Sequence, residues 1–142
     1  MKRLNIYLII LLFLSLLTSC ESEPDVIRNV DVTFIVSGEE FHSPFKANAG
    51  DEIEIVVNGD AQFYSFWPGT PNASYSDYGN EGAENGISLK RNEMDEYTTT
   101  YTYTEAGTFS FDIVCRNYNY GASKYDEKVI SGEITITDSN NN

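Results

Sequence analysis

The sequence has few residues of the kinds that build transition-metal and redox sites. Of its 142 residues, two are Cys, one is His and two are Met. So few soft ligands argue against a transition-metal cluster. Basic residues are scarce as well, because 9 Lys and Arg stand against 22 Asp and Glu, for a net charge of −13. Such an acidic surface repels phosphate backbones, so we expect no nucleic-acid partner.

Aromatic residues, by contrast, are abundant. The chain has ten Tyr and eight Phe, and 41% of its residues are hydrophobic. This composition is too apolar for a disordered chain. The length is that of one domain.

Only one long hydrophobic run occurs, at residues 4–17, after the positive residues Lys2 and Arg3. It is short for a membrane span, and its flanks are those of a secretory signal. The run ends in Leu17-Thr18-Ser19-Cys20, which resembles the lipobox of bacterial lipoproteins. The resemblance implies that residues 1–19 are removed as a lipoprotein signal peptide and that Cys20 is acylated. An ordinary cleaved signal peptide, with Cys20 uninvolved, is the alternative.

Acidic residues follow at once, in Glu21-Ser22-Glu23-Pro24-Asp25. We interpret residues 20–27 as the lipidated Cys and a flexible acidic tether. The stretch resembles the one that follows the lipidated Cys in surface-exported lipoproteins of the Bacteroidota type. That resemblance implies an outer-membrane, lipid-anchored protein exposed on the cell surface. Two or more acyl chains give stable anchoring where one does not.

From residue 28 onward the hydrophobic pattern has a period of two, which predicts strands, and no helical repeat stands out. Turn signals such as Asn58-Gly59-Asp60 separate the candidate strands. We therefore predict an all-β fold, a single antiparallel β-sandwich over residues 28–138, with a polar tail at 139–142. The candidate strands are residues 32–36, 53–57, 61–67, 97–103, 108–115 and 128–137.

Two further expectations concern Cys115 and residues 68–95. If Cys20 is acylated, Cys115 has no partner for an intramolecular disulfide. It alternates with Phe111 and Ile113, so we expect a buried, inert thiol. Residues 68–95 form an unusually long connection, and such segments are commonly functional or mobile.

The stretch from Tyr101 to Asn117 resembles the most characteristic part of PKD (polycystic-kidney-disease-type) domains. There, as here, a Tyr precedes a turn Gly by four residues, an aromatic follows, and alternating apolar residues run to an Asn. Gly50-Asp51-Glu52-Ile53 looks like an earlier motif of the same family. Phe66-Trp67-Pro68-Gly69 stands where the family has a Trp-x-Phe-Gly-Asp-Gly turn, but here the Asp-Gly is missing and a long insertion follows.

This resemblance covers roughly residues 30–138 and implies an Ig-like, PKD-like sandwich. We expect Gly107 to permit a tight reversal, and Tyr103 to fold over that corner and bond to the backbone. If Gly107 has a positive φ, a β-branched residue would be strained there. Several PKD-like domains of Bacteroidota-type surface lipoproteins belong to glycan-utilisation systems, so the resemblance also suggests a surface role.

Catalytic motifs are not apparent, and we expect no enzyme. His42 is the only histidine, and it directly precedes Ser43, so on a strand the two would face opposite sides. No glycine-rich phosphate loop follows a strand and opens a helix. Acidic and Asn side chains around residues 77–96 could offer oxygen ligands to Ca²⁺. The spacing of a calcium loop is missing, so we favour a solvated acidic loop and no cofactor.

The most informative pattern is a set of aromatic residues in two loop regions. Aromatic rings flanked by polar side chains suit sugars, which present apolar C–H faces and hydroxyl rims. We therefore predict a non-catalytic cell-surface binding module with glycan as the leading ligand. The alternative is a structural module that packs on a partner outer-membrane lipoprotein or transporter. For Trp67 a core position is an equal alternative. The candidate ligand-binding residues are Trp67, Tyr75, Tyr78, Tyr118 and Tyr120.

Overall fold

The computed structural model describes residues 22–138. The predicted signal peptide, the predicted acylation at Cys20 and the predicted tail at 139–142 lie outside the described residues. The ten strands are β1 (Val30–Val36), β2 (Glu39–Phe41), β3 (Phe45–Asn48), β4 (Glu52–Gly59), β5 (Phe63–Trp67), β6 (Ile87–Ser88), β7 (Lys90–Arg91), β8 (Tyr97–Thr102), β9 (Gly107–Tyr118) and β10 (Tyr125–Thr137). A short 3-10 helix spans Tyr75–Asp77.

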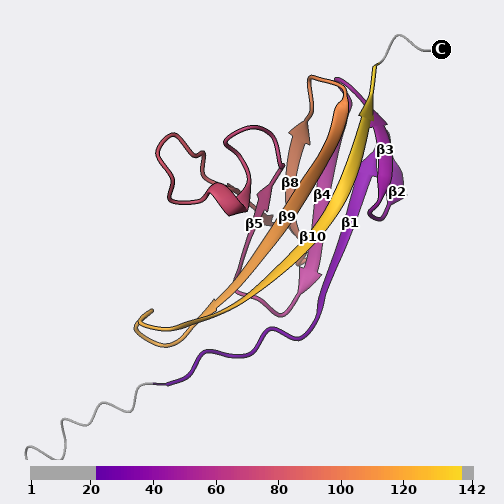
Figure 1. Ribbon diagram of the computed structural model, residues 1–142. Coiled ribbons are helices and arrows are strands. Elements are labelled where there is room, and N and C mark those ends of the chain that lie inside the picture. The colour runs from indigo at the N-terminus through magenta and orange to yellow at the C-terminus, as the bar shows by residue number, and fades with distance from the viewer. Residues whose placement is uncertain (1–21, 139–142) are drawn as a thin grey trace, which may run out of the picture.

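The strands form two five-stranded sheets, in the orders β2-β1-β4-β8-β7 and β3-β10-β9-β5-β6. β9 and β10 make a long hairpin that extends beyond the rest of the fold at one end (Figure 1). The all-β prediction is confirmed, and the two layers correspond to a β-sandwich. The expectation of purely antiparallel strands is wrong for one pair, since β3 runs parallel to β10.

Alternation along the strands places one side of each sheet in a shared core. Ile53, Ile55 and Val57 of β4 are at most 1% exposed. From the facing sheet, the Phe111 ring of β9 lies 4.9 Å from the ring of Phe34 on β1. The core is therefore made by both layers, as a sandwich requires.

The sequence pattern missed four strands: β2, β3, β6 and β7. Each has two to four residues, too few for a period of two to be recognised. Two of them, β6 and β7, lie within residues 68–95, the stretch that the sequence predicts as one long connection without strands. The longest loop is therefore residues 68–86, interrupted by the 3-10 helix.

The corner between β8 and β9 matches the expectation for Tyr103 but not the one for Gly107. Tyr103 is 2% exposed, and its hydroxyl donates a 2.8 Å hydrogen bond to the carbonyl of Pro68. Gly107, however, is not among the glycines with positive φ. A Cβ there would meet only the ring of Phe109, at 3.4 Å. The condition for strain at this position is therefore not met, since the reversal is made without a left-handed Gly107.

Gly107→Ala should consequently change the free energy of unfolding by less than about 1 kcal/mol, because neither strain nor a clash opposes the new methyl group. Urea unfolding of the variant beside the unaltered protein measures the change. A loss of several kcal/mol would show that the corner depends on glycine after all.

Candidate functional site

Three aromatic rings lie side by side on the outer face of the β3-β10-β9-β5-β6 sheet. Phe63 of β5, Tyr118 of β9 and Tyr125 of β10 share this face because their strand positions alternate with core residues. The ring centroids of Phe63 and Tyr118 are 5.7 Å apart, and those of Tyr118 and Tyr125 are 5.8 Å apart. Phe63 and Tyr125 are 59% and 57% exposed. We call these three residues the outer aromatic strip.

A second group of rings, the loop cluster, consists of Trp67, Tyr75 and Tyr78. The centroid of Trp67 lies 5.3 Å from that of Tyr75 and 5.5 Å from that of Tyr78. The structure thus brings together the three aromatic residues that the sequence pattern grouped. Trp67 is only 4% exposed, so it supports the loop rather than offering its face to a ligand, whereas Tyr78 is 55% exposed.

Arg116 of β9 joins the two groups. Its guanidinium carbon lies 5.5 Å from the ring centroid of Tyr125 and 5.9 Å from that of Tyr75. Its Nε donates to Glu127 at 2.6 Å, and its Nη2 donates to the Tyr75 hydroxyl at 2.9 Å. The Tyr75 hydroxyl in turn donates to Glu127 at 2.8 Å. Hydrogen bonds among these three side chains therefore attach the loop of residues 68–86 to β9 and β10.

Two members of this triad, Arg116 and Tyr75, have a shifted pKa. Partial burial opposes the charge of Arg116, but the hydrogen bonds to Glu127 and Tyr75 outweigh it and raise the pKa of the guanidinium above its ordinary value. Burial, together with the hydrogen bond to Glu127, raises the pKa of Tyr75. At neutral pH Arg116 is therefore charged and the Tyr75 phenol is neutral, and the guanidinium is paired with Glu127.

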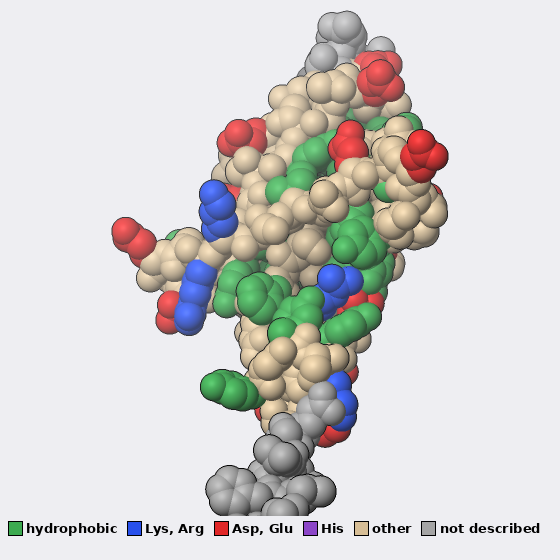
Figure 2. Space-filling model, turned by 90° about the vertical axis from the view of Figure 1, so that its left-hand side faces the viewer, with side chains coloured by type: hydrophobic (Ala, Val, Ile, Leu, Met, Phe, Trp, Pro, Cys, Tyr) green, Lys and Arg blue, Asp and Glu red, His purple; other side chains and the backbone are tan. Residues whose placement is uncertain are grey.

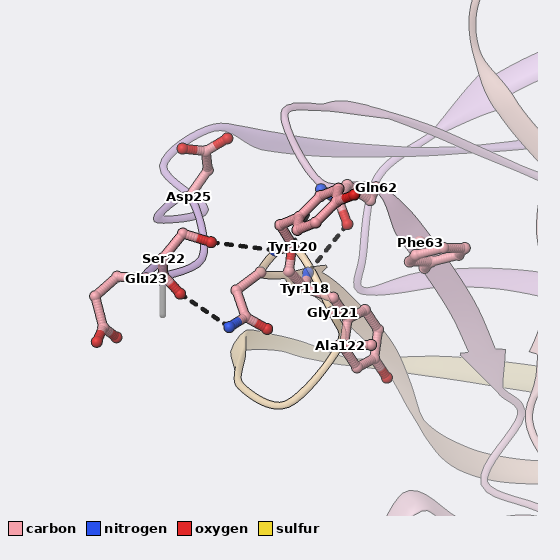
Figure 3. Close-up of a pocket in the computed structure, with 10 residues that line it drawn as sticks. Ser22, Glu23, Asp25, Gln62, Phe63, Tyr118, Tyr120, Gly121 and Ala122 are labelled. Atoms are coloured by element: carbon pink, nitrogen blue, oxygen red, sulfur yellow. Dashed lines mark hydrogen bonds between the residues drawn. The ribbon is translucent and has the colours of Figure 1, made fainter. Parts of the chain in front are cut away.

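Two adjoining cavities flank the outer aromatic strip. The first, the tip cavity, measures about 860 Å³ and lies between residues 22–25 and the turn that connects β9 with β10 (Figure 3). The second, the edge cavity, measures about 530 Å³ and opens along β5, where Ser65, Ser88 and Arg116 contribute to its lining. Gln62, Phe63 and Tyr118 line both cavities.

The wall shared by the two cavities is rigidly placed. The side-chain oxygen of Gln62 accepts a 3.0 Å hydrogen bond from the backbone N–H of Tyr118, which ties β5 to the hairpin. Asn117 is 1% exposed, and its oxygen accepts a 2.6 Å bond from the backbone N–H of Gln62. Figure 2 views the molecule from the side on which β5 lies in Figure 1, and hydrophobic side chains gather across the middle of that face. The aromatic wall is therefore held by backbone-linked amides.

The structure divides the five predicted ligand-binding residues. Tyr118 lies in the strip and is half-buried, and Tyr78 is exposed in the loop cluster. Tyr75 and Trp67 are occupied in internal contacts. Tyr120, at the end of the hairpin, lines the tip cavity with Tyr118 and is 97% exposed.

Sequence reasoning missed Phe63 and Gln62. The signal for Phe63 was present, because the alternation over residues 61–67 places it opposite the core residues Tyr64 and Phe66. No comparable signal marked Gln62, whose role arises from a pairing with Tyr118, 56 residues away.

Other candidate groups are occupied in structural contacts. Ser43 Oγ accepts a 2.8 Å hydrogen bond from the backbone N–H of Glu133, and His42 Nδ1 lies 3.1 Å from the carbonyl oxygen of Val32. Asp60 accepts bonds from the backbone N–H groups of Arg28 and Asn29. Within residues 22–138, no three His, Cys, Asp or Glu side chains are placed to share a metal ion.

Cys115 is fully buried and unpaired, which confirms the expectation of a core thiol. Burial raises its pKa to about 12, so the reactive thiolate is suppressed at neutral pH.

No protein-family model, no curated protein and no solved structure matches the chain. In residues 22–138, no helix has the length and apolar character needed to cross a membrane.

Proposed function

We propose that this protein is a non-catalytic, lipid-anchored binding module of the bacterial outer-membrane surface, with a PKD-like, Ig-like sandwich and a glycan as its ligand. The edge cavity and the outer aromatic strip are the proposed binding site. The anchor is proposed from the sequence Leu17-Thr18-Ser19-Cys20, and the sandwich type from the resemblance over residues 101–117.

The observation that carries the ligand proposal is Phe63. Its ring is 59% exposed at the wall of the edge cavity, although it belongs to a regular strand of a well-packed sheet. A sugar ring stacking on Phe63 would cover its apolar face, while the hydroxyls of Ser65 and Ser88 and the amide of Gln62 offer hydrogen bonds around it. The one charged residue of the lining, Arg116, is paired with Glu127, so an apolar face ringed otherwise by neutral polar groups fits a neutral glycan.

A glycan array, followed by calorimetry on the best ligand, tests this proposal. Phe63→Ala should weaken binding roughly tenfold or more, about 1.4 kcal/mol, because the stacking surface is removed. Met94→Ala is the matched control, since Met94 is also exposed (76%) but lies on the turn between β7 and β8. Stacking is little screened by salt, so the affinity should stay nearly constant as salt is raised through about 0.1–0.2 M.

If the Phe63→Ala and Tyr118→Ala variants bind the glycan as tightly as the unaltered protein, the proposed binding site is wrong.

One observation favours the rival role as a protein-interaction module. β7 covers only Tyr97 and Thr98 of β8, so in the described chain Thr99–Thr102 pair on one side only, with β4. Such an edge can accept a strand from another protein. If no glycan binds and an outer-membrane lipoprotein or transporter co-purifies, this role takes the place of glycan binding.

A further inference from the structure

The first described residues are fastened to the end of the β9–β10 hairpin. Asn119 Nδ2 donates a 2.9 Å hydrogen bond to the carbonyl of Ser22, and the Tyr120 N–H donates to Ser22 Oγ at 3.3 Å (Figure 3). Lys124 Nζ lies 2.6 Å from a carboxylate oxygen of Glu23. The chain thus enters the domain at the hairpin turn.

The fastening continues along the hairpin. Asn117 Nδ2 donates to the carbonyl of Asp25 at 2.9 Å, and the N–H of Ile27 donates to Asp126 at 2.8 Å. Ile27 is 6% exposed and belongs to the core. The expectation of a flexible tether over residues 20–27 is therefore wrong for residues 22–27, because these bonds hold them in place.

This arrangement sets how far the hairpin can lie from Cys20. Consecutive Cα atoms are 3.8 Å apart, so the Cα of Cys20 can lie at most about 7.6 Å from that of Ser22. If Cys20 carries acyl chains that enter a bilayer, Ser22 lies close to the membrane surface, because only one residue separates it from the anchored Cys20. The backbone N–H of Tyr120 is hydrogen-bonded to Ser22 Oγ, so Tyr120 then also lies close to the membrane surface.

The turn has the chemistry of a lipid interface. Tyr120 is 97% exposed, the highest value among the exposed large hydrophobic residues. Tyr rings favour the headgroup layer, where the ring meets apolar groups and the hydroxyl meets water. In a chain with 22 acidic residues, none falls between Ile113 and Tyr125, a stretch that contains Arg116 and Lys124. Two acidic residues, Glu23 and Asp25, line the tip cavity beside the turn, and Glu23 is paired with Lys124.

We propose that the β9–β10 turn docks on the lipid surface in which Cys20 is anchored, with Tyr120 in the headgroup layer. This inference rests on the proposed lipid anchor. The turn and residues 22–27 lie at one end of the sandwich, and the end of β10 lies at the other (Figure 1). With the turn on the membrane, the sandwich stands upright, and the end of β10 points away from the lipid. The 12 residues of β9 then span roughly 40 Å at about 3.3 Å each. The tip cavity then faces the membrane, and the edge cavity opens to the side.

A depth measurement on the full lipidated chain tests this inference. Tyr120→Cys and Glu105→Cys are labelled in turn with an environment-sensitive nitrobenzoxadiazole maleimide, and buried Cys115 stays unlabelled in the folded protein. Glu105 is exposed in the turn before β9, at the opposite end of that strand. Each protein is placed on phosphatidylcholine–phosphatidylethanolamine vesicles with or without brominated acyl chains. We expect a blue shift and quenching by brominated lipid at position 120, and neither at position 105.

Three outcomes would overturn the docking. If the lipidated wild-type protein does not float with the vesicles, or Cys20→Ser floats equally well, the anchor fails and the docking fails with it. If the protein floats but the probe at 120 behaves like the probe at 105, the anchor stands and the docked turn is wrong. If both probes are quenched, the sandwich lies flat and the upright orientation is wrong.

Discussion

Gly69→Ala should lower the free energy of unfolding by more than about 3 kcal/mol, since strain and a steric clash act together at this position. Gly69 has φ +72°, in the left-handed region that favours glycine. A Cβ there would overlap the backbone carbonyl of Ser110 in β9, which cannot move without breaking strand pairing. The neighbouring carbonyl of Pro68 accepts a hydrogen bond from the Tyr103 hydroxyl. The contact between residues 68–69 and β9 therefore also stabilises the corner before β9.

Gly79→Ala is the matched control for this prediction. Gly79 has φ +89°, in the same long loop, but nothing lies within 4 Å of its would-be Cβ. It should therefore lose only the conformational part, about 1–2 kcal/mol. Urea unfolding followed by far-UV circular dichroism measures both variants. Equal losses would mean that the contact with Ser110 is not what holds the start of the loop.

The sheets were the most predictable part of the molecule. Where apolar and polar residues alternate over five or more positions, as around Ile53 and Ile113, burial of one face is enough to specify a strand. Short strands such as β3 exist because a longer neighbour pairs with them: its four residues take their register from β10. That pairing spans about 90 residues and has no local signal.

The candidate site was predictable only in part. Nearness to one long loop in the sequence grouped Trp67, Tyr75 and Tyr78, and their rings do lie together in the structure. The sequence pattern left open whether Trp67 is exposed or buried, and the structure buries it, at 4% exposed. Nor did it reveal that Arg116 links the loop to the hairpin, since its contacts with Tyr75 and Glu127 join three separate elements.

Trp67→Ala should cost about 3–5 kcal/mol, the usual range for truncating a buried aromatic residue. The indole contacts Tyr75 and Tyr78, and the backbone of Gly86 lies directly against it, so both ends of the loop depend on it. Its Nε1 donates to Ser65 Oγ at 3.1 Å, which fixes the ring on the outer face of β5. We expect the variant to become sensitive to protease within residues 68–86 before the sheets unfold.

Phe63→Ala is the comparison that gives this result its meaning. Phe63 and Trp67 lie on the same strand and the same face, but one is 59% and the other 4% exposed. Removing the Phe63 ring should change stability by less than about 1 kcal/mol, because little of its surface is buried on folding. Chemical unfolding and limited proteolysis on both variants separate support of the loop from contact with a ligand. If Phe63→Ala unfolds as easily as Trp67→Ala, the Phe63 ring is a packing residue and its exposure does not mark a binding surface.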